Sequence, residues 1–157
     1  MLKSIEGNFD HPEVDELLKK HFIELRACSP VGSAHVLDIP GLQVPSIKFW
    51  SLWEKNRLMG CGAIKFLAKD HGEFKSIRIH DDFKKKRNGT KVINHLINEA
   101  KKLKIKRLSI ETGAGEYFVP ARKLFNSCGF EPCLPFAHYE QDINSLYFTK
   151  LINNKKN

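Results

Sequence analysis

The sequence of 157 residues lacks an apolar run of the ~20 residues that a membrane-spanning helix needs. Glu6 and Asp10 interrupt its N-terminal stretch, so the apolar region of a signal peptide is missing too. These two absences predict a cytoplasmic protein that has no membrane partner.

The patterns of metal, disulfide and nucleotide sites are also missing. The four cysteines include no C-x-x-C pair, and the seven histidines include no H-E-x-x-H pattern. We therefore expect reduced thiols and no metal. The patterns G-x-x-x-x-G-K-[ST] and G-x-G-x-x-G are absent as well, so a phosphate-bearing ligand would have to be held in another way.

Negative charge is in short supply: the formal net charge is +8, and the cations gather in two clusters. Residues 101–107 are interpreted as a solvated helix face. The other cluster lies at a predicted helix start, where it would attract an anionic ligand. It consists of Lys84, Lys85, Lys86, Arg87 and Lys91. Nucleic acid is the weakest candidate for that anion, because no RRM, KH or helix-turn-helix signature occurs and no aromatic residues are interleaved. We therefore expect no nucleic-acid partner.

Hydrophobic periodicity predicts one α/β domain over residues 1–157, with a frayed tail at 152–157. Asp10 is the expected N-cap of the first helix. Helices are expected at 11–26, 89–103 and 118–128. Strands are expected at 2–6, 47–53, 57–67, 73–79, 107–111 and 145–151. Residues 27–45 are rich in Pro, Gly and Ser and should form a long, partly helical loop, of a length that usually serves a function.

The stretch from Gly72 to Gly113 is the most informative part of the chain. It reads as a strand, a basic turn containing glycine, an apolar-striped helix and a second strand. Free backbone N–H groups, the helix dipole and nearby cations all favour an anion at the start of that helix. The sequence therefore predicts a phosphate site there.

Several separated motifs in this order resemble the GNAT superfamily of acetyl-CoA-dependent N-acetyltransferases, and in particular a subgroup of small single-domain bacterial proteins. The motifs stand at Phe49–Lys65, His71–Arg78, Arg107–Gly113 and Pro120–Phe130. The resemblance implies a mixed α/β fold with a mostly antiparallel sheet of about six or seven strands and helices on both faces. It also implies that strands four and five splay apart. A homodimer is one option, since family members associate through various edges.

The resemblance also implies acetyl-CoA as the co-substrate and assigns residues to it. The backbone of Ser76, Ile77, Arg78 and Ile79 would hold the thioester arm as an added strand. The pyrophosphate would lie on the turn of Lys84, Lys85, Lys86, Arg87, Asn88, Gly89 and Thr90. In the best alignment with R/Q-x-x-G-x-G, Gly89 is the second glycine and Arg87 replaces the first, where glycine permits positive φ or a close approach of phosphate. Arg122 could reach a phosphate or be merely solvated.

Glu73 is the candidate general base, because a similarly placed glutamate has this role in several family members. An alkyl amine with a pKa near ~10.4 is mostly protonated at neutral pH and must lose a proton before it attacks. The alternative is an ordinary surface glutamate, paired with a lysine. Glu111 could contact a cationic acceptor or only cap the turn after its strand. His35 could shape the acceptor pocket or be incidental. Phe125 stands where many family members carry a tyrosine that protonates the thiolate, which leaves water, Tyr117 or Tyr139 for that task.

These residues lead to one function and one alternative from another class. The first is an N-acetyltransferase that transfers the acetyl group from acetyl-CoA to the primary amine of a small molecule or peptide, by direct attack in a ternary complex. The alternative is a non-catalytic module that senses coenzyme A or docks a partner, which the departures at Arg87 and Phe125 would allow.

Overall fold

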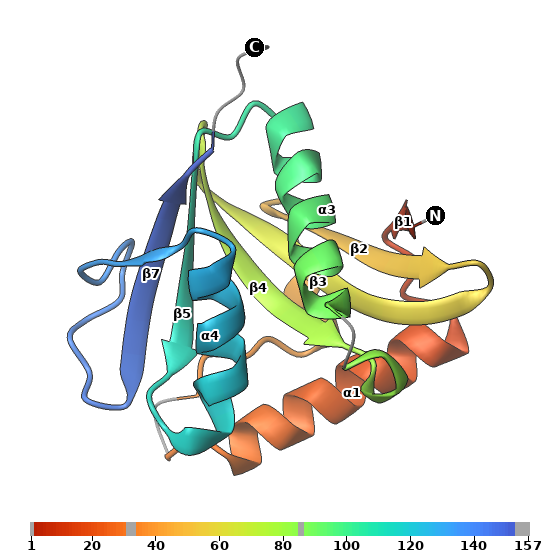
Figure 1. Ribbon diagram of the computed structural model, residues 1–157, viewed down its shortest axis with the longest axis horizontal. Helices are drawn as coiled ribbons and strands as arrows, with labels where there is room; N and C mark the ends of the chain where they lie inside the picture. Colours follow the sequence, from red (N-terminus) through yellow and green to blue (C-terminus); the bar gives the residue numbers. More distant parts are fainter. Residues whose placement is uncertain (1, 31–33, 85–86, 153–157) are drawn as a thin grey trace.

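The computed structural model describes residues 2–30, 34–84 and 87–152, and a seven-stranded sheet runs through this part of the chain (Figure 1). The strands are β1 (Leu2–Glu6), β2 (Ile47–Glu54), β3 (Arg57–Ala68), β4 (His71–Ile79), β5 (Arg107–Gly113), β6 (Glu131–Pro132) and β7 (Ser145–Leu151). The α-helices are α1 (Pro12–Ala27), α2 (Ile39–Leu42), α3 (Asn88–Lys102) and α4 (Val119–Ser127), with 3-10 turns at Asp81–Phe83 and Glu116–Phe118.

The sheet has the order β1-β2-β3-β4-β5-β7-β6. Neighbouring strands are antiparallel except β4 and β5, which are parallel. A parallel pair needs a crossover, and α3 supplies it between these two strands. The predicted fold class, a mixed and mostly antiparallel sheet with helices around it, is confirmed.

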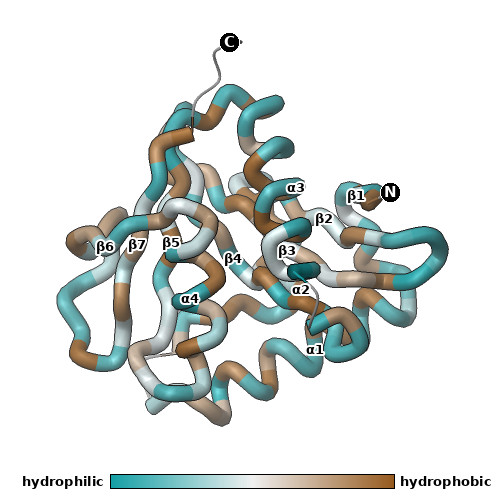
Figure 2. Tube along the Cα trace, viewed as in Figure 1, coloured by the Kyte–Doolittle hydropathy of each residue, from teal (hydrophilic) through white to brown (hydrophobic). Residues whose placement is uncertain are grey.

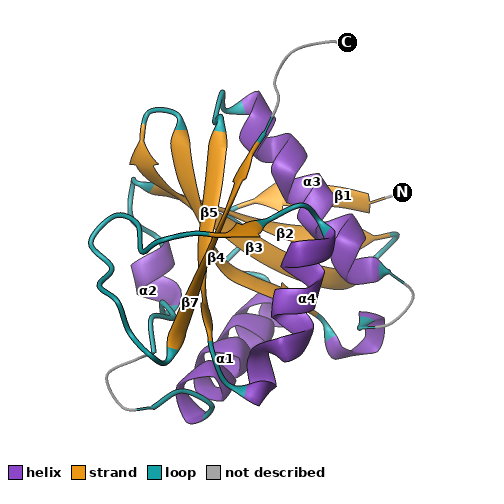
Figure 3. Cartoon of the chain, turned by 60° about the vertical axis from the view of Figure 1, so that its left-hand side comes forward, coloured by secondary structure: helices purple, strands orange, loops and turns teal. Residues whose placement is uncertain are grey.

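Helices lie on both faces of the sheet (Figure 3), and a hydrophobic cluster packs between the helices and the sheet on each face. On one face α3 packs against the centre of the sheet with the predicted stripe, in which the residues from Val92 to Ala100 that face the core are fully or almost fully buried. On the other face α1 and α2 pack with Val14, Leu18 and Leu42 against β2 and β3. The hydropathy colouring shows hydrophobic and hydrophilic bands alternating along both long helices, as amphipathic packing requires (Figure 2).

Three local predictions need correction. His11, not Asp10, caps α1: its Nδ1 accepts a hydrogen bond from the backbone N–H of Glu13 at 3.1 Å, and Pro12 follows in the first turn. The two-residue strand β6 was not predicted, because so short an edge strand has no periodicity to detect. Ile152, predicted to lie in the frayed tail, is buried and donates its N–H to the Lys106 carbonyl at 2.8 Å.

No helix in the described part of the chain is both long and apolar enough to cross a bilayer. Over the same residues, no group of three or more His, Cys, Asp or Glu side chains is arranged to hold a metal ion.

Candidate active site

The site begins where the sheet opens. Among the described residues, β4 pairs with β5 only over its first three positions, His71 to Glu73. A β-bulge then breaks the register of β4 against β3, and Ser76 within it takes a left-handed φ of 53°. The Cys61 thiol supports the bulge by donating to the Ser76 carbonyl at 3.4 Å. As bulges bend strands, β4 turns away from β5 (Figure 1).

A cavity of about 650 Å³ occupies this opening. β4 lines it continuously from Glu73 to Ile79. Gly89 and Thr90 of α3 line it, as do Leu124 and Phe125 of α4. From the opposite face of the sheet come α1 and the loop that follows it, and the end of β5 lines the cavity from within the sheet. The cavity thus passes through the sheet and reaches both layers of helices.

The first turn of α3 lies at the cavity, as the phosphate prediction requires. Arg87, its N-cap, takes the left-handed conformation with φ 62° and ψ 21°, which glycine adopts freely and other residues at a cost of about 1–2 kcal/mol. The backbone therefore keeps a glycine-like shape where the motif has its first glycine. Gly89 has a different role, because it allows α3 to pack closely against Leu124 of α4: a Cβ at this position would lie 2.9 Å from Leu124 Cδ2. Lys85 and Lys86 lie outside the described residues.

Glu73 is the most deeply buried acid at the cavity, with 1% of its surface exposed. The Tyr139 hydroxyl donates to its Oε2 at 2.6 Å, and the Lys75 ammonium lies 3.4 Å from the same oxygen. Oε1 is buried and has no hydrogen-bond partner among the described residues. The interpretation of Glu73 as a surface residue is therefore wrong, although it does pair with a lysine. One oxygen of Glu73 is therefore fixed by two partners, and the other is without one in the part of the chain that the structure describes.

Lys75 and Tyr139 join two loops to β4 at this point. Lys75 Nζ donates to the Tyr139 hydroxyl oxygen at 3.1 Å and to the His35 carbonyl at 3.2 Å. The His35 ring meets the Tyr139 ring edge-on, with centroids 5.1 Å apart. Burial and the Glu73 carboxylate raise the pKa of the Tyr139 hydroxyl above its ordinary value, so the hydroxyl remains a donor.

Glu111, on the neighbouring strand, places a second carboxyl group at the cavity. The Ser145 hydroxyl donates to its Oε2 at 2.7 Å. Burial raises the pKa of the Glu111 carboxyl above its ordinary value, and the Glu73 charge acts in the same direction, while the Ser145 hydrogen bond opposes both. A cation bound beside the Glu111 carboxyl would favour its ionised form.

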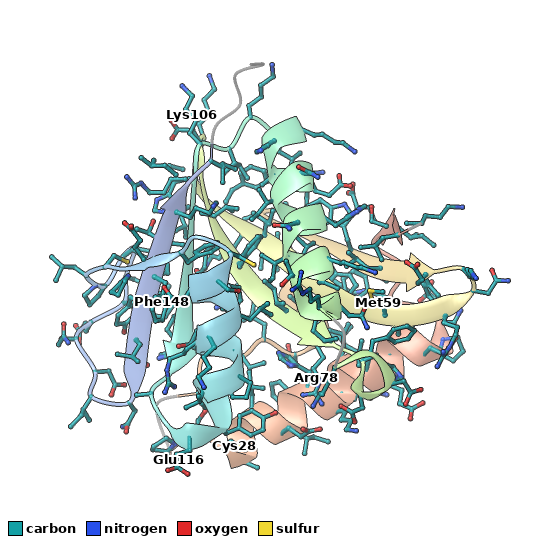
Figure 4. The ribbon with its side chains drawn as sticks, in the orientation of Figure 1. Cys28, Met59, Arg78, Lys106, Glu116 and Phe148 are labelled. Atoms are coloured by element: carbon teal, nitrogen blue, oxygen red, sulfur yellow. The ribbon has the colours of Figure 1, made fainter. Side chains whose placement is uncertain are left out.

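Arg78 is buried near the end of β4, with 6% exposed, and its side chain extends towards α1 (Figure 4). Its Nη2 donates to the Glu24 carboxylate at 3.0 and 3.2 Å, and its Nη1 to the Tyr117 hydroxyl at 3.4 Å. His21, one turn before Glu24, is also buried at the cavity. Burial, together with the Arg78 charge, lowers the pKa of His21 to about 4, so its imidazole is neutral at neutral pH.

Most of the predicted site residues that the structure describes come together at this one cavity. Those that line it are Glu73, Ser76, Ile77, Arg78, Ile79, Lys84, Arg87, Gly89, Thr90, His35 and Glu111. Asn88 begins α3 without lining the cavity. Arg122 lies elsewhere: its Nη1 donates to the carbonyls of Gly113 and Gly115 at 2.8 and 2.9 Å. Arg122 therefore fastens the turn after β5, which does not favour the predicted phosphate contact.

Three polar residues at the site were not predicted to belong to it: Lys75, His21 and Tyr139. Lys75 could have been found, because it is two positions after Glu73 and so lies on the same face of the strand. His21 sits within the apolar stripe of α1, where a histidine looks like part of the core. Tyr139 lies in an irregular loop without a pattern, and the sequence suggests it only as a proton donor to the thiolate.

Phe125, which stands where many family members carry a tyrosine, packs edge-to-face on Phe130, with centroids 5.5 Å apart, as a core residue would.

Comparison with known proteins agrees with this geometry. Residues 12–130 match the acetyltransferase (GNAT) family. The chain is 44% identical over 138 residues to the uncharacterized N-acetyltransferase YsnE of Bacillus subtilis (strain 168), which covers 88% of this chain and 91% of that protein. The chain therefore belongs to the GNAT family of acetyltransferases.

Solved structures show the same fold at low sequence identity. A Klebsiella pneumoniae protein assigned to the acyl-CoA N-acyltransferases superposes with a TM-score of 0.76 at 20% identity, over 96% of this chain and 97% of that one. A GNAT acetyltransferase from Elizabethkingia anophelis, solved with acetyl-CoA bound, superposes with a TM-score of 0.65 at 16% identity, over 96% and 98%.

The conformation of Arg87 can be tested with two variants that lose the same cation. Arg87→Gly should be more stable than Arg87→Ala by about 1 kcal/mol, because only glycine takes the left-handed region without steric cost. Urea denaturation at neutral pH measures the difference in the free energy of unfolding. If the alanine variant were equally stable, the left-handed backbone at this position would be contradicted.

The burial of neutral His21 predicts a loss of stability in acid. The folded protein resists protonation of His21 until the pH nears 4, whereas the unfolded chain binds that proton near 6.5. The unfolded state therefore holds more protons between these values, and stability falls as the pH drops through this window. From about pH 7.5 to about pH 5, His21 should account for a loss of about 2 kcal/mol. His21→Gln should lose that much less than the parent in urea titrations at the two pH values, and equal losses would refute the assignment.

Proposed function

We propose that this protein transfers the acetyl group of acetyl-CoA to the primary amine of a small molecule or peptide, by direct attack within a ternary complex. The observation that supports this most is the cavity that runs from the first turn of α3, through the gap between β4 and β5, to the free oxygen of Glu73. Acetyl-CoA is an intracellular metabolite, so the proposed reaction agrees with a cytoplasmic location. We also propose that the protein acts as a single domain.

The cofactor would bind to the first turn of α3 and to the edge of β4 that β5 leaves unpaired. Its diphosphate would be bound by the N–H groups and positive dipole of the first turn of α3, with Arg87 and Lys84 adding charge. Its pantetheine arm would form hydrogen bonds with β4 from Ser76 to Ile79, where β5 no longer competes for them. The acetyl-CoA-bound neighbour from Elizabethkingia anophelis supports the choice of acetyl-CoA.

Glu73 would accept the proton of the acceptor amine, directly or through a water. Tyr139 and Lys75 hold Oε2, which supports a role for the unpartnered Oε1 in contacting the substrate. The neutral amine nitrogen then bonds to the thioester carbonyl carbon, and the N–H groups of β4 stabilise the oxyanion that forms. The C–S bond breaks as the carbonyl reforms, and the sulfur leaves as coenzyme A thiolate. The nitrogen, which became cationic when it bonded to carbon, gives its second proton through water to this thiolate, whose thiol pKa is near ~8.5.

The base role predicts the behaviour of Glu73→Gln. Turnover should fall by about 10²–10⁴-fold, because a positioned base contributes roughly that much. Affinity for acetyl-CoA, measured by calorimetry, should change little. The defect should also shrink for acceptors of lower amine pKa, which need less help to lose their proton.

Glu131→Gln, at an exposed edge of the sheet, serves as the matched control and should keep full turnover. A Glu73→Gln enzyme as active as the parent would remove Glu73 from the mechanism. No saturable binding of acetyl-CoA at high micromolar concentration would overturn the proposed function itself.

A further inference from the structure

Four buried polar atoms that lack a hydrogen-bond partner among the described residues belong to residues lining the same cavity. They are His21 Nδ1, Glu73 Oε1, Ser76 Oγ and Arg78 Nε. A buried polar atom without a partner costs free energy, so such atoms are rare in folded proteins. Four of them around one cavity point to a ligand that supplies the missing partners.

These atoms offer opposite chemistry on opposite sides. On the α1 side, the N–H at Arg78 Nε is a charged donor, and His21 of the same cavity has an unpartnered Nδ1, which donates in the neutral tautomer that carries its proton there. On the β5 side, Glu73 Oε1 is a free carboxylate oxygen, and Glu111 adds a second carboxyl group. One ligand end should therefore accept hydrogen bonds, and the other should donate them.

Charge also differs between the two sides. Around Arg78, the cations Arg78 and Lys20 balance the carboxylates of Glu24 and Asp81, so this side carries no excess negative charge. Lys84, which also pairs with Asp81, is the residue assigned above to the diphosphate. Around Glu73 the excess is negative, because two carboxyl groups, Glu73 and Glu111, face the ammonium of Lys75. A ligand whose ammonium lies on the Glu73 side matches this division.

The side that holds Arg78 is not simply the phosphate site of the cofactor. Arg78 lies on the sheet face that carries α1, because its guanidinium bonds to Glu24 of that helix. Its neighbours Ile77 and Ile79 turn the other way and pack into the cluster around α3, where the diphosphate would bind. Arg78 and His21 therefore face the acceptor side of the cavity.

We propose that the acceptor is an amine that also carries a carboxylate, as an amino acid does. Its carboxylate binds the Nε–H of Arg78 and the imidazole of His21, since a guanidinium is the side chain best suited to a carboxylate. Its ammonium lies towards Glu73 and Glu111 before it gives up a proton. This inference names the acceptor class of the proposed function and rests on it.

The test compares acceptors that differ only in the carboxylate. With acetyl-CoA as donor, release of coenzyme A is followed for phenylalanine, phenylalaninamide and phenethylamine, for alanine, alaninamide and ethylamine, and for 4-aminobutyrate and butylamine. In at least one series kcat/KM should favour the carboxylate-bearing acceptor by about tenfold or more, since a buried polar site rejects analogues that leave it unpaired. The preferred series also gives the spacing of amine and carboxylate.

Two variants then connect the preference to the site. Arg78→Gln should abolish the preference for the carboxylate, mainly through KM. Because Arg78 also fastens α1, His21→Leu serves as a second variant that removes a polar contact without leaving an unpaired atom, and it should reduce the preference as well. Lys19→Gln is the control, since it removes an exposed charge from α1 away from the cavity and should leave the preference unchanged.

The outcomes separate this inference from the function on which it rests. Acetylation of the amines without any preference for a carboxylate would overturn the acceptor class and leave the transferase standing. A preference that survives in both Arg78→Gln and His21→Leu would refute the assigned contacts. Bound acetyl-CoA with no turnover on any of these acceptors would overturn both.

Discussion

The incomplete pairing of β4 with β5 is the constraint on which the rest of the site depends. Backbone N–H and C=O groups within a sheet are normally satisfied by the neighbouring strand, yet the bulge at Ser76 bends β4 away after Glu73. The opening exposes a strand edge inside the protein and joins two layers that a continuous sheet would separate. In the proposed reaction, cofactor and acceptor would meet through the gap, each from its own face of the sheet.

The polar residues around the gap follow from this geometry. Side chains on the α1 face of β4 enter this opening. Among the described residues, not all of their polar atoms have a hydrogen-bond partner, so Arg78 and Glu73 are only partly satisfied. The loops around His35 and Tyr139 supply just enough contacts to fix Glu73 at one oxygen. A fully satisfied carboxylate would be a structural element. A half-satisfied one is held in place and keeps one oxygen for the proton transfer proposed above.

The sequence predicted the framework well because periodicity and order of motifs determine it. The stripe of α3 and the strand ending at Ile79 are confirmed, and most of the predicted site residues that the structure describes line one cavity. The left-handed backbone of Arg87 could not be predicted, because arginine normally avoids this conformation. Since Arg87 keeps the backbone shape that the motif glycine would have, its presence weakens the case for a non-catalytic module. Tyr139 and His21 escaped because a loop without a pattern and an apolar helix stripe carry no signal of what they contact in space.

The central claim is that acetyl-CoA occupies the gap between β4 and β5, and amide hydrogen exchange tests it most directly. Saturating acetyl-CoA should slow the exchange of the amides of Ser76 to Ile79 and of the first turn of α3, because both would become hydrogen-bonded to the cofactor. The amides of β1 and β2, far from the gap, should exchange at the same rate as before. Protection confined to other regions, or none at saturation, would contradict the account.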